Sequence, residues 1–243
     1  ANDTLSGIVG ALEVMKRLAE RERLRFSYQF LLGPELFGTI FYTKDKPVGE
    51  VEGVIGLLCV GNDAPLKVQH SFWGGTDIDN VAEAATSPEA MRGFRSINGS
   101  DEIVWAAPGI EKPRVSLTRA PYDTYHALYA DAVEGVSLKA LEDTVATVMR
   151  MVDILETNFT AHPNFEGLVS LSNPKNGLHF SPGTDPSRSD PGAGRWHNLM
   201  NGLPQCMARG MSVLEIALRY DLPFEEVRDY MLKWFEKGLV NIG

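Results

Sequence analysis

The apolar positions of this chain switch between helical and extended spacing, and this alternation predicts an α/β layer architecture. Residues 4–22 and 138–158 each carry an apolar stripe at helical spacing with charged residues opposite, which predicts two amphipathic helices. Residues 51–60 (VEGVIGLLCV) form a nearly continuous apolar run, which predicts a central strand covered on both faces. Shorter patterns predict strands at residues 25–32, 39–43, 66–73 and 114–118 and a capped helix at residues 77–85.

The composition changes near residue 170. Residues 170–195 are rich in Ser, Asn, Pro and Gly, which predicts a linker or a long surface loop. Three short helices are expected after it, at residues 196–207, 212–219 and 223–237, and this tail resembles a winged helix. We therefore expect three parts: a domain at residues 1–169, the linker or loop at 170–195, and a small winged-helix-like domain at 196–243.

The charge balance excludes several classes of partner. The chain has 243 residues with 23 basic and 32 acidic side chains, a net charge of −9. This disfavours general nucleic-acid binding and docking on an anionic membrane, both of which need a positive surface. The tail at 195–243 has six basic and six acidic residues, so we expect it to pack or to dock a partner rather than to read DNA.

Two cysteines far apart in the sequence, Cys59 and Cys206, argue against a disulfide framework and favour a reducing, cytoplasmic setting. No window has the 18 or so consecutive apolar residues of a membrane span, and the first residues have no signal-peptide pattern.

Candidate chemistry lies at the ends of the predicted elements. Asp3 precedes the first helix, Glu35 follows Gly33-Pro34 between extended runs, and Asp63 ends the most apolar strand. His126 lies outside any periodic segment. Carboxylates and an imidazole are ligands of hydrolytic zinc sites, in which a bound water reaches a pKa of about 7. The alternatives are a helix N-cap for Asp3 and a solvated turn for Glu35.

Five segments, in order, resemble M28-type zinc aminopeptidases, and the closest likeness is to the aminopeptidase-like branch with the DUF4910 domain and a C-terminal winged helix. Residues 2–7 resemble the "NDNLSG" step, residues 33–39 the "PETIGS" segment and residues 59–63 the "CVGD" strand end. Residues 99–102 with 107–110 resemble "GSDE…SPGI", and residues 116–119 with 125–126 resemble "SLMR…YHTS". The resemblance implies part of a phosphorylase/hydrolase-like zinc-peptidase sheet sandwiched by helices, followed by the small winged-helix domain.

The resemblance also implies a ligand set for one or two Zn²⁺ ions. Asp3 becomes the bridging ligand, Glu35 and His126 become terminal ligands, and Asp63 supplies the remaining carboxylate. Asn62 stands directly before Asp63, so the ligand is shifted by one position or replaced by an amide. The implied substrate is a peptide or an amino-acyl small molecule, cleaved at an amide bond near a free amino group.

Some positions depart from the family pattern. Pro34 occupies the place of the general base, so we consider Asp101 or Glu102 as substitutes, the alternative being loop acids that cap local amides. Asp131 follows His126 by five residues instead of four, and is a candidate acceptor that orients the imidazole.

Arg119 or Tyr125 is expected to position the substrate. For Arg119, a structural ion pair is an alternative of equal weight.

In the family, strands and a histidine ligand precede the bridging aspartate, and His70, His162, His179 and His197 match no ligand position. We therefore expect a second polypeptide to supply the strands and the histidine in a hetero-oligomer. Two other functions stay open: a pseudoenzyme or assembly module, and a metal-dependent deacetylase or amide-transfer enzyme in biosynthesis.

Overall fold

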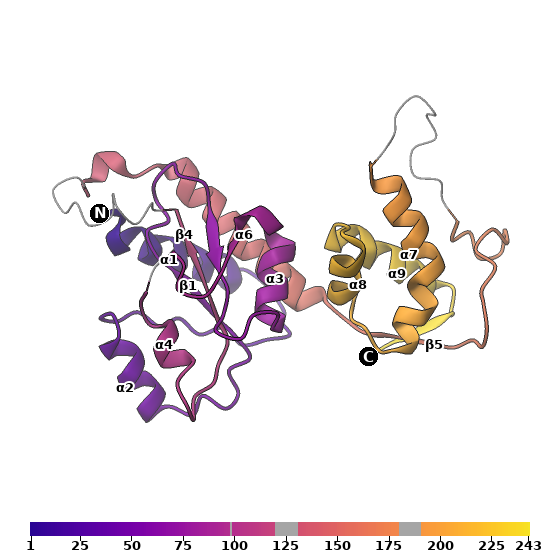
Figure 1. Ribbon diagram of the computed structural model, residues 1–243, viewed down its shortest axis with the longest axis horizontal. Coiled ribbons are helices and arrows are strands. Elements are labelled where there is room, and N and C mark those ends of the chain that lie inside the picture. Colours follow the sequence, from indigo (N-terminus) through magenta and orange to yellow (C-terminus); the bar gives the residue numbers. More distant parts are fainter. Residues whose placement is uncertain (98, 120–130, 180–190) are drawn as a thin grey trace. The chain divides into compact units, whose positions relative to one another are not determined.

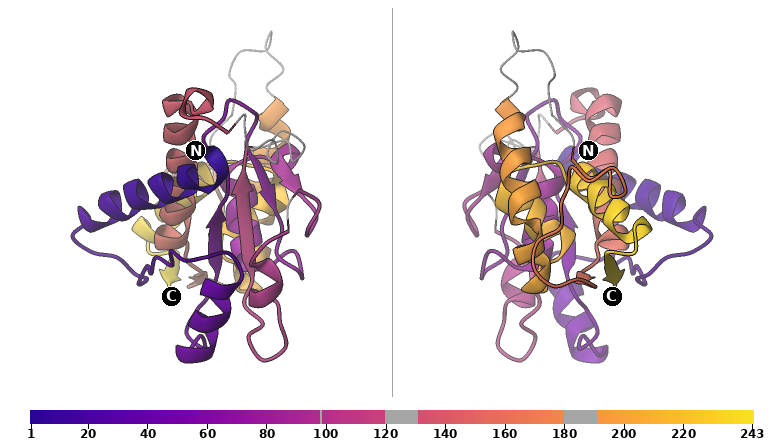
Figure 2. Two further views of the ribbon diagram at one scale, coloured as in Figure 1. Left: turned by 90° about the vertical axis from the view of Figure 1, so that its left-hand side faces the viewer. Right: turned by 90° about the vertical axis from the view of Figure 1, so that its right-hand side faces the viewer.

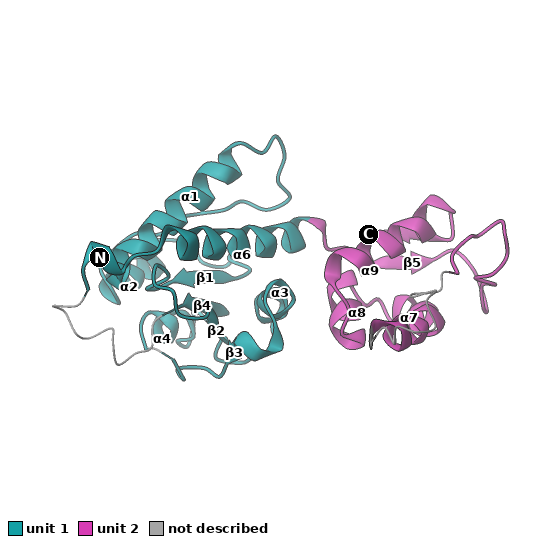
Figure 3. Ribbon diagram, turned by 90° about the horizontal axis from the view of Figure 1, so that it is seen from above, with its two compact units in different colours: residues 1–156 teal, residues 157–243 magenta. Residues whose placement is uncertain are grey.

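The computed structural model describes residues 1–97, 99–119, 131–179 and 191–243, which form two compact units (Figures 1 and 3). The first unit is Ala1–Glu156 and the second is Thr157–Gly243. Residues 157–169, which the sequence analysis assigned to the first domain, thus belong to the second unit. The reason is that β5 (Ala161–Pro163) pairs antiparallel with β6 (Val240–Ile242) near the end of the chain.

The first unit contains a mixed sheet of four strands in the order β1-β4-β2-β3. These strands are β1 (Val54–Leu57), β4 (Arg114–Thr118), β2 (Lys67–Gln69) and β3 (Met91–Arg92). β1 runs parallel to β4, whereas β2 runs antiparallel to β4 and parallel to β3. Val115 and Leu117 of β4 have no exposed surface, so the hydrophobic core of this unit is built around β4.

Helices and helical turns surround this sheet. They are η1 (Asn2–Ser6), α1 (Gly7–Ala19), α2 (Phe37–Asp45), α3 (Asp77–Ala85), η2 (Pro88–Ala90), α4 (Glu102–Trp105), η4 (Val133–Gly135) and α6 (Leu138–Thr157). α1 comes close to α6 at Gly10, where a Cβ atom would lie 3.9 Å from the Val145 side chain. The far end of α1 points away from α6 (Figure 3). α2 and α4 contact each other at one end of the unit (Figures 1 and 2). The helix expected at residues 77–85 is confirmed with the same ends, and those expected at residues 4–22 and 138–158 are confirmed with shifted ends.

Three expected strands differ in the structure. Residues 39–43 belong to the helix α2, because Asp101 fixes its first turn and this tertiary contact outweighs the strand propensity of Ile40 and Phe41. Residues 25–32 have no regular secondary structure; Glu156 instead accepts hydrogen bonds from the Phe26 amide and the Tyr28 hydroxyl. The apolar run 51–60 forms a strand only at 54–57, and this strand is at an edge of the described sheet rather than in its centre.

One face of α1 is apolar and exposed. The buried face consists of Gly7, Gly10, Val14 and Leu18. On the other side, and on the turn before it, lie the residues that we call the α1 stripe, with their exposed fractions: Leu5 60%, Ile8 37%, Val9 53%, Leu12 43% and Met15 42%. Contiguous apolar surface of this kind marks a place where something else packs.

The described residues of the second unit form three helices and the β5–β6 pair. The helices are α7 (Pro191–Ala208), α8 (Val213–Tyr220) and α9 (Phe224–Glu236), close to the expected ranges. Ser212 and Glu215 form a reciprocal capping box that starts α8. Part of the expected linker packs on this unit, since Leu178 is buried and its carbonyl accepts from the Tyr230 hydroxyl at 3.0 Å.

Both cysteines are buried as thiols, Cys59 in the first unit and Cys206 in the second. Within the described ranges, the helices are all too short or too polar to cross a bilayer.

Candidate functional site

The turn that carries Asp3 is fastened to the exit of β1. The Asn2 side chain accepts from the Gly61 amide at 2.8 Å, and the Ser6 hydroxyl accepts from the Val60 amide at 3.0 Å. Gly7 packs directly on the strand, since a Cβ atom there would lie 2.2 Å from the Leu57 carbonyl oxygen. The segment 2–7 therefore lies beside the segment 59–63, as expected if side chains from both meet at the carboxyl end of a strand.

Asp131 holds the same turn from the other side. Its carboxylate oxygens accept from the nitrogen of Ala1 at 2.6 Å, the amide of Asn2 at 2.7 Å and the amide of Asp3 at 3.1 Å. Asp131 was expected to orient His126. Residues 120–130 lie outside the described ranges, so His126 and Tyr125 are not placed, and the described partners of Asp131 are backbone donors.

Asn62 and Asp63 form the turn after β1. The Asn62 side-chain oxygen accepts from the Ala64 amide at 3.0 Å, an arrangement typical of an Asx turn, and Asp63 is exposed. Of the two, Asp63 therefore has the carboxylate accessible to a ligand.

Arg119 holds this turn to α6. Its guanidinium donates to the Ala64 carbonyl at 3.0 Å, to the Thr144 hydroxyl at 3.0 Å and to the Asp143 carboxylate. The Arg119 side chain is 7% exposed, whereas that of Asp143 is 65% exposed. Because its donors are already engaged, Arg119 is better suited to support the turn than to bind a substrate.

Glu35 lies in a tight turn that leads into α2. The Phe37 amide donates to the Glu35 carbonyl at 2.6 Å, and Leu36 between them has φ 60° and ψ −58°. This is a γ-turn with positive φ, a rare and strained conformation for a residue with a side chain. Asp101 braces it, since its carboxylate accepts from the Leu36 amide at 2.5 Å and from the Thr39 hydroxyl at 2.9 Å.

Glu102 is buried in a network of charged side chains. One oxygen accepts from the Ser100 amide at 2.7 Å and from Arg114 at 3.3 Å, and the other lies 3.3 Å from the Arg95 guanidinium. Burial lowers the pKa of Arg114, and the Asp101, Glu102 and Glu35 carboxylates oppose this shift. A buried carboxylate between two guanidinium groups is poorly placed to take a proton from water.

The network of Arg95, Glu102 and Arg114 was not among the features predicted from the sequence. The signal was available, because Arg114 is a charged residue in the expected strand 114–118 and a buried charge requires a partner. Gly56 and Gly99 give the two guanidinium groups room, since a Cβ atom would lie 2.4 Å from Arg114 and 2.3 Å from Arg95.

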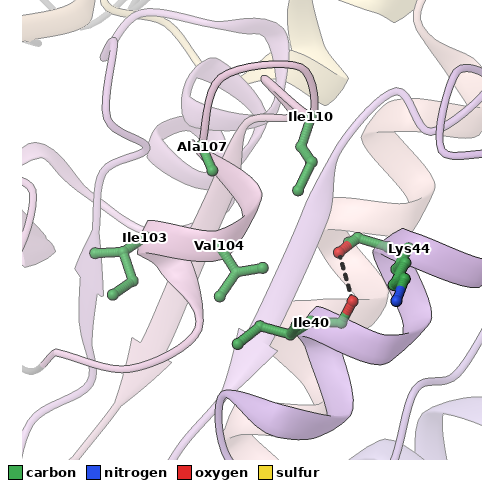
Figure 4. Close-up of a pocket in the computed structure, with 7 residues that line it drawn as sticks. Ile40, Lys44, Ile103, Val104, Ala107 and Ile110 are labelled. Atoms are coloured by element: carbon green, nitrogen blue, oxygen red, sulfur yellow. Dashed lines mark hydrogen bonds between the residues drawn. The ribbon is translucent and has the colours of Figure 1, made fainter.

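An apolar groove lies between α2 and α4, next to the Glu35 turn in sequence. Its volume is about 430 Å³. Figure 4 shows side chains of both helices and of the following loop around it: Ile40, Lys44, Ile103, Val104, Ala107 and Ile110. A groove of this size with one cation at its rim could accept an apolar side chain.

The described residues bring two acidic segments to the exit of β1, at Asp3 and Asp63, and join Glu35 to Asp101 through the Leu36 amide. They contain no group of three His, Cys, Asp or Glu side chains close enough to hold a metal ion together. The donor types suit zinc, but the described part of the chain does not by itself make a complete site.

Comparison with known proteins gives three matches. Residues 1–158 match the model of the family described as "Domain of unknown function (DUF4910)". Over 168 residues the chain is 30% identical to a Clostridium acetobutylicum protein named "Putative polysaccharide biosynthesis protein with aminopeptidase-like domain". This match covers 65% of this chain and 38% of that protein. A crystal structure described as a "putative peptidase" from Clostridium acetobutylicum matches 100% of this chain and 54% of its own, with a TM-score of 0.78 at 21% identity.

The chain thus spans less than two thirds of the length of either relative. At 21% identity the solved structure supports the fold alone, a small mixed sheet with helices. The family model covers residues 1–158, which include the whole first unit with its Asp3, Glu35 and Asp63 segments. This chain therefore belongs to the DUF4910 family.

Proposed function

We propose that the protein is a metal-dependent hydrolase of the aminopeptidase type, which cleaves an amide bond near a free amino group. The observation that carries the proposal is the fastening of the Asp3 turn to the exit of β1 beside Asp63, through the hydrogen bond from the Gly61 amide to Asn2. The aminopeptidase-like and peptidase names of the two relatives support it. It agrees with the likeness to M28-type enzymes.

In this proposal Asp3, Glu35, Asp63 and His126 hold one or two zinc ions. Zinc supplies a water of lowered pKa and polarises a carbonyl group. The chain's own contribution is to fix the carboxylates: Asn2 and Asp131 hold the Asp3 turn, and Arg119 holds the Asp63 turn. Pro34 cannot accept a proton, both Asp101 oxygens accept hydrogen bonds, and Glu102 is buried between two guanidinium groups, so the proton acceptor comes from elsewhere in the assembly or from a ligand carboxylate.

The test is elemental analysis and peptidase assay of the native assembly, with Asp3→Ala and His126→Ala beside the exposed surface control Glu20→Ala. We expect stoichiometric zinc and release of an N-terminal residue in the native protein and the control. Bound zinc and peptidase activity should both be lost in the two ligand variants. In the native protein, a chelator should remove both, and added zinc should restore both. Full activity in Asp3→Ala or His126→Ala would refute the model.

The engaged oxygens of Asp101 and Glu102, together with Pro34, favour a second candidate, a pseudoenzyme or assembly module. In that case the native assembly would hold no stoichiometric zinc, and the winged-helix-like tail would act as the docking unit.

The name of the relative in polysaccharide biosynthesis favours a third candidate function, that of a metal-dependent deacetylase or amide-transfer enzyme. A zinc-loaded assembly that acts on an N-acetylated amino sugar and leaves aminoacyl anilides intact would select it.

We further propose that a second polypeptide covers the α1 stripe and the open edge of β1, in a hetero-oligomer. An apolar strand at a sheet edge and a contiguous apolar helix face are both surfaces that pair with other chains. A zinc-loaded monomer of this chain alone, measured by light scattering, would overturn the proposal.

A further inference from the structure

The strained turn after Glu35 is braced by a side chain from a distant part of the sequence. Leu36 has φ 60°, a region that glycine tolerates and that strains residues with a side chain. Such a conformation persists only where neighbouring groups over-determine it. Asp101, 65 positions away, accepts from the Leu36 amide at 2.5 Å and from the Thr39 hydroxyl at 2.9 Å.

Asp101 is itself held in place by its neighbour. Glu102 follows it at the start of α4 and is buried, with its oxygens toward the Ser100 amide, Arg114 and Arg95. Thr39 is also buried, at 3% exposure. The hydrogen bonds of Asp101 therefore join a rigid, buried anchor to the turn that carries Glu35.

Resting on the proposed function, in which Glu35 is a ligand, we infer that Asp101 is a positioning residue: by holding the Leu36 turn it fixes the backbone that carries the Glu35 carboxylate. This differs from the general-base role considered from sequence. A general base needs an oxygen accessible to the reacting water, whereas both oxygens of Asp101 bind groups of the Glu35 segment. Asp131 acts in the same way on the other ligand segment, by accepting from the amides of Asn2 and Asp3.

Two variants of Asp101 separate the two roles in the full-length protein in its native assembly. Asp101→Asn keeps an oxygen for the Leu36 amide, and its amide group can donate to the Thr39 hydroxyl. Asp101→Ala removes both bonds. For positioning we expect zinc affinity, measured by competition with a chelating dye, to fall at least tenfold in Asp101→Ala. In Asp101→Asn, affinity and kcat should stay within about threefold of the native protein.

Two results would overturn the inference. A loss of kcat in Asp101→Asn of a hundredfold or more with zinc affinity kept would identify Asp101 as the general base. Unchanged zinc affinity in folded Asp101→Ala would leave Asp101 only a stabilising role.

Hydrogen exchange of the Leu36 amide keeps this test independent of the proposed function. We expect at least tenfold faster exchange in metal-free Asp101→Ala than in the metal-free native protein, with Asp101→Asn close to native. If the native assembly binds no zinc, the proposed function fails while faster exchange still supports bracing of the turn. Equal exchange rates in all three proteins would refute the bracing itself.

Discussion

Gly7 and Gly10 offer a matched pair of substitutions on the buried face of α1. Both are helical glycines, so replacement by alanine gains about 0.5–1 kcal/mol of helix propensity in the helix interior. At Gly10 the new Cβ atom would meet the Leu57, Val60 and Val145 side chains at 3.6–3.9 Å, which is ordinary contact. At Gly7 it would lie 2.2 Å from the Leu57 carbonyl oxygen. Carbon and oxygen normally stay about 3.3 Å or more apart, so the helix must move by about 1 Å.

We therefore expect opposite effects on the free energy of unfolding. Gly10→Ala should stabilise the first unit by up to about 1 kcal/mol, whereas Gly7→Ala should destabilise it by about 1–3 kcal/mol, the usual cost of overpacking. Urea unfolding, monitored through the hydrogen exchange of peptides from β1 and β4, measures the stability of the first unit separately from that of the second. If Gly7→Ala proved as stable as Gly10→Ala, the close packing of α1 on β1 would be refuted.

Three further predictions concern buried polar groups of the first unit. Asp79→Asn should cost about 2 kcal/mol, because the carboxylate accepts from the amides and hydroxyls of Ser71 and Thr76. Burial raises the pKa of Asp79, but those hydrogen bonds outweigh it and hold the pKa below the usual 3.8. The native protein should therefore lose this stabilisation as the pH falls below about 4, and an acid titration of unfolding should show a smaller loss in Asp79→Asn. Arg119→Met should lower stability by about 2 kcal/mol, seen as a shift in urea midpoint, whereas a substrate role would raise KM at unchanged stability. Glu102→Gln should cost about 3 kcal/mol in the same measurement, because it leaves a buried guanidinium without its carboxylate; a loss of kcat alone would instead indicate the general base.

The parts of the fold that could be predicted from sequence are those with a strong local period. α6 and β4 follow from the apolar spacing of their own residues. α2 could not be found in this way, since its aromatic and β-branched residues favour a strand and its first turn depends on Asp101, which is distant in sequence. The edge position of β1 also has no local signature, because the same apolar run suits a buried strand.

The candidate site divides in the same way. That Asp3 and Asp63 would lie on neighbouring segments was predictable, because one precedes a helix and the other ends a strand that this helix covers. The hydrogen-bond partners of Asp101, Asp131 and Arg119 could not be predicted, because each of these hydrogen bonds joins segments at least 24 residues apart. Long-range hydrogen bonds of this kind depend on side-chain geometry rather than on spacing.

The placement of one buried thiol in each compact unit has a practical consequence. Cys59 has no exposed surface and Cys206 has 4%, so neither should react with an aromatic disulfide reagent while its unit stays closed. The modification rate of each sulfur then measures how often its own half of the molecule opens. Cys59→Ala and Cys206→Ala would each leave one reactive thiol. The native chain thus carries in each unit a cysteine whose modification rate reports the local opening of that unit.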